Sequence, residues 1–172
     1  GQIEGFFSIP GDVLSGYHII KPYLLDMLPS MNNPVMLTAD LGFAKRGRRY
    51  AEALNIPLAF IEKRRHGNRD KSEALTIIGD VLHRDVILID DEVDTGGSMA
   101  EAATLAKENG AENIYMVFVH PILSTNAVER LTALPVKQFI TTNTIPIPPE
   151  RQALFGGRLT ILTIGPLIGE VI

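Results

Sequence analysis

Two neighbouring carboxylates and a glycine-containing turn follow one short apolar run of the chain. Residues 86–89 are apolar and rich in β-branched side chains, which favours a buried strand over a helix. Asp90 and Asp91 come directly after this run. A group that could bind an anion comes next: Asp94, Thr95, Gly96, Gly97 and Ser98. Glycines let a backbone approach an anion closely, and a helix that begins there adds oriented amides and the positive end of its dipole.

This arrangement suits a sugar phosphate. The turn at 94–98 would bind a phosphate monoester, while Asp90 and Asp91 would accept hydrogen bonds from ribose hydroxyls or hold a cation. The alternative is a helix cap, in which Asp94 or Ser98 bonds the amides of the first helical turn. A cap does not explain the two carboxylates at the strand end, so the pattern favours a binding site.

A further carboxylate follows another apolar run. Asp40 comes two residues after the strand expected over Val35–Thr38. It could ligate Mg²⁺, which prefers one or two carboxylates together with substrate phosphates. It could equally cap the helix that is expected to begin near Phe43. That helix has a basic face, which we expect to contact solvent or another subunit: Lys45, Arg46, Arg48 and Arg49.

Basic side chains also follow the strand expected over residues 57–61. Lys63 and Arg65 belong to the polar segment 62–71, which we expect to form a loop. Cations at a strand end could stabilise a diphosphoryl group during its transfer, although a solvated charged surface is the commoner origin of such a run. We expect residues 65–70 to be poorly ordered without a ligand, since they have no apolar anchor.

Apolar runs alternate with helical patterns along the chain. Strands are expected over 35–38, 57–61, 86–89, 114–119, 136–140 and 159–163, and helices over 44–54, 98–109, 125–132 and from about 166. Residues 72–78 fit either element, and the proline-rich segment 142–155 is expected to be irregular. The alternation predicts an α/β fold with a mainly parallel sheet flanked by helices. Ligands of such sheets bind outside the carboxyl ends of the strands.

The composition narrows the class of protein. The 172 residues are 45% hydrophobic and 21% charged, which is typical of one globular domain. A net charge of −4 argues against a general nucleic-acid binder, and no run reaches the roughly 18 apolar residues that span a bilayer. The chain has no cysteine, which excludes disulfides and fits the cytoplasmic location that we expect.

Taken together, residues 86–98 resemble the phosphoribosyl pyrophosphate signature shared by type I phosphoribosyltransferases and ribose-phosphate pyrophosphokinases. The segments around Asp40 and Lys63, and the segment that starts at Gln2, are similar to segments of the pyrophosphokinases. So are residues 119–124, 141–145 and 164–167. The resemblance covers essentially the whole chain and corresponds to the C-terminal half of a ribose-phosphate pyrophosphokinase.

The resemblance implies a single domain over residues 1–172 with a type I phosphoribosyltransferase-like fold. It also implies transfer of diphosphate from ATP to ribose 5-phosphate, with Mg²⁺ as cofactor. Asp90 and Asp91 would then hold the ribose and residues 94–98 its 5-phosphate, and Asp40 would assist the metal ion. Lys63 and Arg65 would be catalytic. The family's N-terminal half, which contributes a metal-binding histidine and much of the ATP site, has no counterpart here, so we expect the isolated chain to be inactive.

Two other functions stay open. A phosphoribosyltransferase would use the same signature, but it needs a base-binding segment for which the sequence offers no candidate. A non-catalytic subunit is compatible with Ala39 and Phe43, which stand where the family usually has Pro and Gly, whereas Lys63 and Arg65 argue against it. We expect a homo-oligomer, because exposed adjacent phenylalanines are unfavourable on a monomer. The residues expected at its interface are Ile3, Phe6, Phe7 and Ile9.

Overall fold

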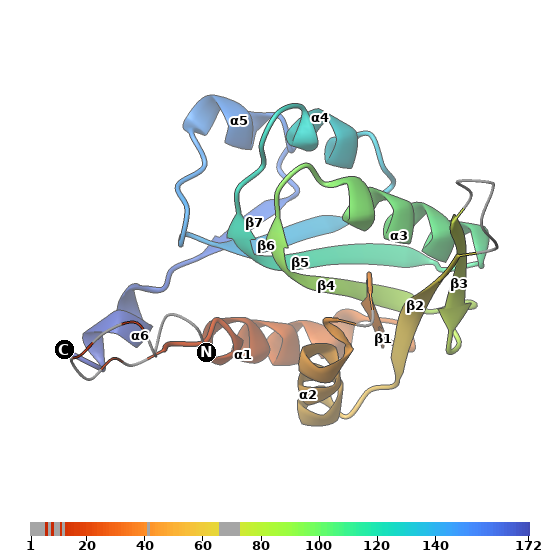
Figure 1. Ribbon diagram of the computed structural model, residues 1–172, viewed down its shortest axis with the longest axis horizontal. Coiled ribbons are helices and arrows are strands. Elements are labelled where there is room, and N and C mark those ends of the chain that lie inside the picture. The colour runs from red at the N-terminus through yellow and green to blue at the C-terminus, as the bar shows by residue number, and fades with distance from the viewer. Residues whose placement is uncertain (1–5, 7, 9–10, 12, 41, 66–72) are drawn as a thin grey trace.

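The chain folds around one seven-stranded sheet with helices on both faces (Figure 1). The computed structural model describes residues 6, 8, 11, 13–40, 42–65 and 73–172, without the side chains of 64, 65, 73 and 74. The strand order is β3-β2-β1-β4-β5-β6-β7. All neighbours pair in parallel except β2 and β3, which are antiparallel. The predicted α/β architecture with a mainly parallel sheet is therefore confirmed.

The elements follow one another regularly. The strands are β1 (Val35–Thr38), β2 (Leu58–Arg65), β3 (Glu73–Ile78), β4 (Asp85–Val93), β5 (Asn113–Pro121), β6 (Gln138–Thr142) and β7 (Leu159–Leu162). The α-helices are α1 (Tyr17–Met27), α2 (Ala44–Leu54), α3 (Gly97–Glu108), α4 (Ala127–Thr132), α5 (Pro149–Ala153) and α6 (Gly165–Gly169), and a 3₁₀ turn covers Leu28–Ser30. Within the described part of the chain, no helix is long and apolar enough to cross a membrane.

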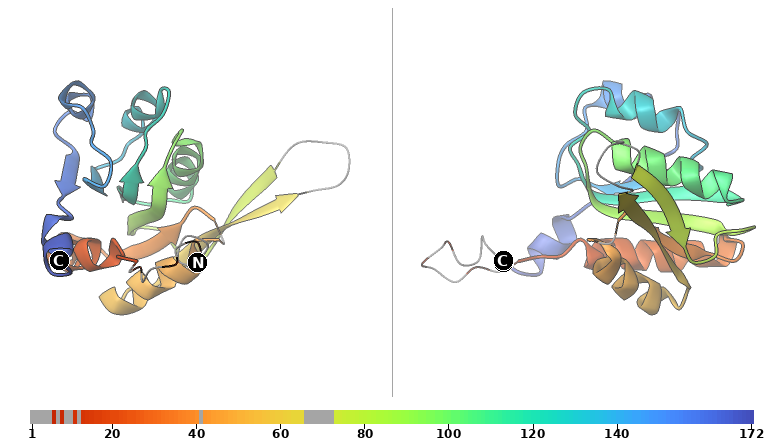
Figure 2. Two further views of the ribbon diagram at one scale, coloured as in Figure 1. Left: turned by 60° about the vertical axis from the view of Figure 1, so that its left-hand side comes forward. Right: turned by 45° about the vertical axis from the view of Figure 1, so that its right-hand side comes forward.

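Several strands extend further than their apolar runs predict. β4 continues to Val93, so that Asp90 and Asp91 lie within a strand, and Glu92 pairs with His120 of β5. β2 continues to Arg65 because β3 pairs with it as an antiparallel strand, and the two extend away from the rest of the sheet (Figure 2). The loop predicted from residue 62 is therefore wrong for its first four residues. Residues 66–71, and with them most of the segment expected to be poorly ordered, lie outside the described residues.

Two helices differ from the sequence prediction. The segment 142–155 is not wholly irregular, because it contains α5, which begins at Pro149. Proline suits the first turn of a helix, where its missing amide costs nothing. Helix α1 has no counterpart in the prediction, and it holds Pro22 in its interior. Its buried residues Ile20 and Leu24 pack in the core beneath the sheet, and this contact outweighs the weak local signal.

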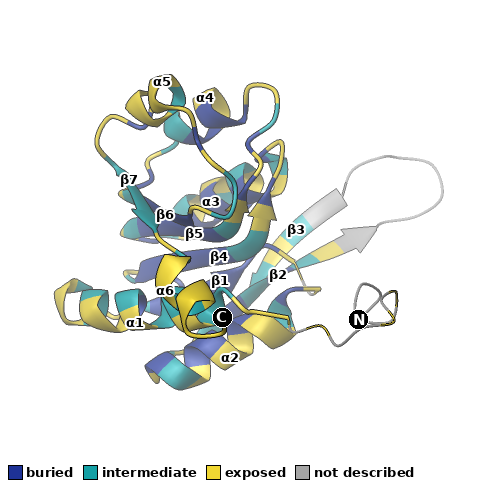
Figure 3. Cartoon of the chain, turned by 90° about the vertical axis from the view of Figure 1, so that its left-hand side faces the viewer, coloured by how far each residue is buried: buried dark blue, intermediate teal, exposed yellow. Residues whose placement is uncertain are grey.

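The sheet separates two apolar cores. Leu88, Met116 and Phe118 pack with α3 and α4 on one face. Ile87 and Ile89, the alternate residues of β4, pack with α1 and α2 on the other face. This period of two is the signature of a strand covered on both sides. The central strands are accordingly buried along most of their length (Figure 3).

Helix α2 packs directly onto β1 at Gly47. A Cβ atom added to Gly47 would lie 2.3 Å from Cγ2 of Thr38, whose side chain is fully buried. Only a residue without a side chain allows this approach, because Thr38 is branched at Cβ and cannot swing aside. The contact fixes where α2 begins, and thus the connection that carries Asp40.

We predict that Gly47→Ala lowers the free energy of unfolding by about 2 kcal/mol, because the added methyl group overpacks the contact with Thr38. At an exposed helical position the same change would raise stability by roughly 1 kcal/mol, so the sign of the effect separates packing from helix propensity. Adding Thr38→Ser removes the clashing methyl group and should recover most of the loss. Urea denaturation of the four proteins of this double-mutant cycle measures the coupling, and two independent, additive effects would contradict the assignment.

Candidate functional site

The carboxyl ends of β1 and β4 bring Asp40 close to the carboxylates of β4. The two strands pair in parallel with Thr38 opposite Ile89, so the segments that follow them leave the sheet at the same edge. A cavity of about 270 Å³ at this edge is lined by Asp40 and by every residue of the segment 90–99. The structure therefore places together the candidate metal ligand and all the residues predicted to hold a sugar phosphate.

The turn between β4 and α3 depends on Gly96. Its φ of +73° is in the left-handed region, and a Cβ there would lie 3.2 Å from Leu131. Neither Asp94 nor Ser98 caps α3, because no side chain bonds the first helical turn in the described structure. The capping alternative is therefore wrong for these residues.

The amides at the start of α3 are available to an anion. In the described part of the chain, no backbone or side-chain acceptor bonds the amides of Gly97, Ser98 or Met99. The carbonyls of the turn are used instead: that of Asp94 accepts a hydrogen bond of 2.9 Å from the amide of Ser124, and that of Thr95 accepts one from the side chain of Arg130. These contacts fix the turn while its donors stay unpaired, as an anion site requires.

Gly97 is not required by packing. A Cβ added there would meet one described atom within 4 Å, Oγ1 of Thr95 at 3.7 Å, which is an ordinary contact. Its φ is not in the left-handed region either, in contrast to that of Gly96. The absence of a side chain at Gly97 therefore keeps space clear above the unpaired amides.

Asp90 and Asp91 have different partners. Asp90 is half-buried, and its Oδ1 accepts a hydrogen bond of 2.9 Å from the amide of Asp91. The carboxylate of Asp91 forms an ion pair with Arg46 of α2. Burial raises the pKa of Asp90 to about 7, and the charges of Asp91 and Asp40 act in the same direction. Carboxylates that repel one another in this way would be stabilised by a cation or by hydroxyl donors.

One carboxylate oxygen of Asp40 is bonded within the chain, and its metal-binding role stays a prediction. Its Oδ1 accepts a hydrogen bond of 2.9 Å from the amide of Phe43, the residue just before α2, so it holds the turn that leads into the helix. No described residue bonds its Oδ2, which leaves one oxygen for a ligand. Among the described residues, no three acidic, histidine or cysteine side chains are grouped to hold a metal ion. A magnesium ion would therefore depend on substrate oxygens as well.

The predicted catalytic residues lie further from the cavity. Lys63 is exposed on β2, which is separated from β4 by β1, and it does not line the cavity. Arg65 ends the same strand opposite Glu73, and its side chain lies outside the description. Their catalytic role stays a prediction.

One residue of the site is missed by the sequence analysis. Arg46 is assigned there to a face in contact with solvent or another subunit, yet its guanidinium pairs with Asp91 although its side chain is 66% exposed. The connection that begins at Asp40 must place the first turn of α2 at the same sheet edge as the carboxyl end of β4, and this geometric signal could have identified it.

We predict that the contribution of Asp90 to stability falls as the pH rises from about 4 to about 7, because the folded protein binds the Asp90 proton more tightly than the unfolded chain. The pKa of Asp80 is lowered and acts in the opposite direction, so the contribution of Asp90 is measured as a difference from Asp90→Asn. Asp90→Asn cannot ionise, so it should match the wild type at pH 4 and exceed it at pH 8 by about 1–2 kcal/mol. This difference in stability is smaller than the whole pKa shift of Asp90 would imply, since water reaches the half-buried carboxyl group. Guanidinium denaturation across this range tests the prediction, with exposed Asp26→Asn as the control. A difference between Asp90→Asn and wild type that does not change with pH would contradict it.

Comparisons with known proteins agree with this geometry. The family model described as the phosphoribosyl synthetase-associated domain matches residues 65–172. The ribose-phosphate pyrophosphokinase of Clostridium acetobutylicum is 37% identical over 171 residues, which cover 99% of this chain and 52% of that protein. That of a Nostoc species is 40% identical over 174 residues, covering 99% of this chain and 50% of the relative. The chain thus spans about half the length of the curated relatives it matches.

Solved structures extend the agreement to the fold. The crystal structure of phosphoribosylpyrophosphate synthetase from Mycobacterium smegmatis superposes with a TM-score of 0.85 at 32% identity, covering 99% of this chain and 53% of that one. Adenine phosphoribosyltransferase from Trypanosoma brucei superposes with a TM-score of 0.53 at 20% identity, covering 71% of this chain and 61% of that one, and shows the same type of fold. The predicted type I phosphoribosyltransferase-like fold is therefore confirmed. The chain belongs to the phosphoribosyl synthetase-associated domain family and is a relative of the ribose-phosphate pyrophosphokinases.

Proposed function

We propose that the chain is the ribose-phosphate-binding domain of an enzyme that transfers diphosphate from ATP to ribose 5-phosphate, giving phosphoribosyl pyrophosphate and AMP. One observation carries the proposal: a single cavity combines the unpaired amides at the start of α3 with the carboxylates of Asp40, Asp90 and Asp91. Amides select an anion and carboxylates select hydroxyl groups, and a sugar phosphate presents both kinds of group.

The cavity gives the substrate one orientation. The 5-phosphate would accept hydrogen bonds from the amides of residues 97–99, and the ribose hydroxyls would donate to Asp90 and Asp91. Asp94 is exposed and would turn its carboxylate away from the phosphate. Asp91 would have to share its carboxylate between the sugar and Arg46, its partner in the structure.

The proposed reaction requires the protein to orient the substrates and to stabilise charge. The 1-hydroxyl oxygen of the sugar forms a bond to the β-phosphorus of ATP and loses its proton to solvent, while the bond from that phosphorus to the oxygen of the α-phosphate breaks and AMP leaves with the bonding electron pair. Phosphoryl transfer of this kind is catalysed mainly by orientation and by stabilisation of charge. We assign orientation of the substrate to the cavity lined by Asp40 and residues 90–99, called here the sugar-phosphate cavity. We assign stabilisation of charge to Lys63 and Arg65.

Magnesium fits the residues of the site. Oδ2 of Asp40, which no described residue bonds, and the carboxylates of Asp90 and Asp91 offer the one or two ligands that Mg²⁺ takes beside substrate phosphates. A bound ion would supply positive charge to the diphosphate oxygens. The bound ion would also reduce the repulsion among the three carboxylates, and this would stabilise the domain.

The non-catalytic alternative stays open. Phe43 does not line the cavity at residues 90–99, but it lines a neighbouring pocket together with Asp40, Asp90 and Asp91, where a diphosphate would approach. A cytoplasmic homo-oligomer is part of the proposal. Of the residues expected at its interface, Phe6 is 87% exposed, and the other three lie outside the described residues.

We predict that this chain binds both ribose 5-phosphate and inorganic phosphate, and that isothermal titration separates the two subsites. Gly97→Val should weaken both ligands at least about tenfold, because the side chain has room within the protein but occupies the approach to the amides. Asp90→Asn combined with Asp91→Asn should weaken ribose 5-phosphate about tenfold and leave inorganic phosphate unchanged, since only the sugar has hydroxyls.

The matched control for the turn is Gly169→Val on α6, where nothing lies within 4 Å of an added Cβ. It should change neither affinity. If the double aspartate variant weakens both ligands equally, or if Gly97→Val leaves them unaffected, the assignment of the sugar and phosphate subsites is wrong.

A further inference from the structure

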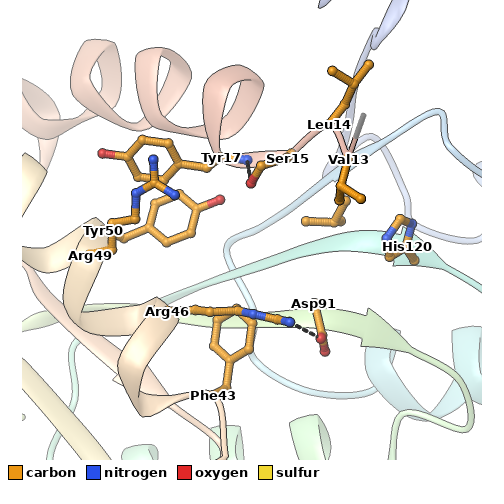
Figure 4. A pocket seen from close by; sticks show the side chains of 12 residues that line it. Val13, Leu14, Ser15, Tyr17, Phe43, Arg46, Arg49, Tyr50, Asp91 and His120 are labelled. Atoms are coloured by element: carbon orange, nitrogen blue, oxygen red, sulfur yellow. Dashed lines mark hydrogen bonds and ion pairs between the residues drawn. The ribbon is translucent and has the colours of Figure 1, made fainter. Parts of the chain in front are cut away.

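A second cavity, of about 280 Å³, lies between α1, α2 and the carboxyl end of β5 (Figure 4). It shares Asp91 with the sugar-phosphate cavity, and Arg46 reaches across its wall to pair with that carboxylate. None of the residues of the turn at 94–98 lines it. It therefore borders the sugar-phosphate cavity but lies away from the turn at 94–98, and the proposed reaction assigns no role to it.

The hydroxyl group of Tyr50 opens into this cavity and has no partner among the described residues. The residue is only 5% exposed, and its hydroxyl is directed toward the space beside Leu14 and Arg46 (Figure 4). Burial raises the pKa of Tyr50 well above its usual range, so the group stays a hydroxyl donor at every physiological pH. A ligand oxygen in the cavity could accept its hydrogen bond in place of solvent.

A guanidinium group with no carboxylate partner stands next to this hydroxyl. Arg49 lies over the ring of Tyr17, with its Cζ 4.0 Å from the ring centroid. Among the described residues it forms no ion pair, in contrast to Arg46. Stacking holds the guanidinium plane while its N–H groups remain able to donate at the plane's edge. Lys21, 5.9 Å from the same ring, adds to the positive charge.

Part of the remaining wall of the cavity is apolar, and the side chains of Leu14 and Val119 form it. The ring of Phe43 is partly covered, because Cζ of Arg46 lies 5.7 Å from its centroid, and the polar residues Ser15 and His120 also line the cavity. An apolar wall beside cationic donors suits a ligand with an apolar body and one anionic end. The volume is at the lower end for small-molecule sites, so the ligand must be compact.

We propose that this second cavity binds a compact aromatic anion, an aromatic ring that carries one phosphate or carboxylate group. The anionic end accepts hydrogen bonds from Arg49 and from the hydroxyl of Tyr50, and the ring packs against Leu14 and Val119. An anion held here also attracts Arg46 and so competes with Asp91 for it. A ligand in the second cavity would therefore weaken the ion pair of Asp91, a carboxylate of the sugar-phosphate cavity.

Isothermal titration of this chain with phenyl phosphate tests the proposal. Arg49→Gln should weaken binding at least about tenfold, since it removes the unpaired cation, and Tyr50→Phe should weaken it by about fivefold to tenfold. The matched control is Arg48→Gln, an exposed neighbour on α2 that does not line the cavity and should leave the affinity unchanged. At the second cavity, where binding depends on Arg49, inorganic phosphate should bind at least about tenfold more weakly than phenyl phosphate, because it lacks the ring.

Phenyl phosphate can also bind the turn at 94–98, because it is a phosphate monoester. The titrations are therefore made in Gly97→Val, which blocks that turn and should retain the binding that depends on Arg49. Binding that Gly97→Val abolishes would overturn the proposal, since the ligand would then occupy the sugar-phosphate cavity. In the Gly97→Val background, binding that neither Arg49→Gln nor Tyr50→Phe weakens would also overturn it, as would equal affinities for inorganic and phenyl phosphate. Circular dichroism confirms that each variant is folded, and should Tyr50→Phe unfold, the exposed Arg49 still decides the outcome.

Discussion

The parallel pairing of β4 with β1 on one side and β5 on the other is the constraint on which the candidate site depends. Because of this pairing, the three strands end at one edge of the sheet, so that Asp40 lies close to Asp90 and Asp91 although about fifty residues separate them in the sequence. It also forces α3 to begin there, with its unpaired amides beside the carboxylates. A slip of one residue in β4 would exchange the faces on which the two aspartates lie and dissolve the arrangement.

The site concentrates unfavourable electrostatics on a rigid support. Asp90 lies within a paired strand rather than in a loop, so it cannot move away from the neighbouring negative charges. The cost appears as the raised pKa of this carboxyl group. Such a cost at the edge of an otherwise regular sheet is common where a ligand or an ion completes the charge balance. The ion pair of Asp91 with Arg46 provides part of that balance within the protein itself.

Local patterns predicted the parts of the molecule that neighbouring residues determine. The strand before Asp90, the turn at Gly96 and the helix after it are all specified within about twenty residues. Features that depend on distant partners were not predictable in this way. β2 is long because β3 pairs with it, and the Arg46 ion pair joins residues 45 positions apart. The environment of Tyr50 likewise needs α1, which its sequence signal did not reveal because packing, rather than propensity, stabilises that helix.

The contact of Gly47 with Thr38 limits how this protein can vary. Exposed positions of α2 can exchange one charged residue for another while the helix stays where it is. Position 47 has no such freedom unless position 38 becomes smaller at the same time. Two residues nine positions apart in the chain would thus be inherited as a pair, and the placement of Asp40 would be preserved through them.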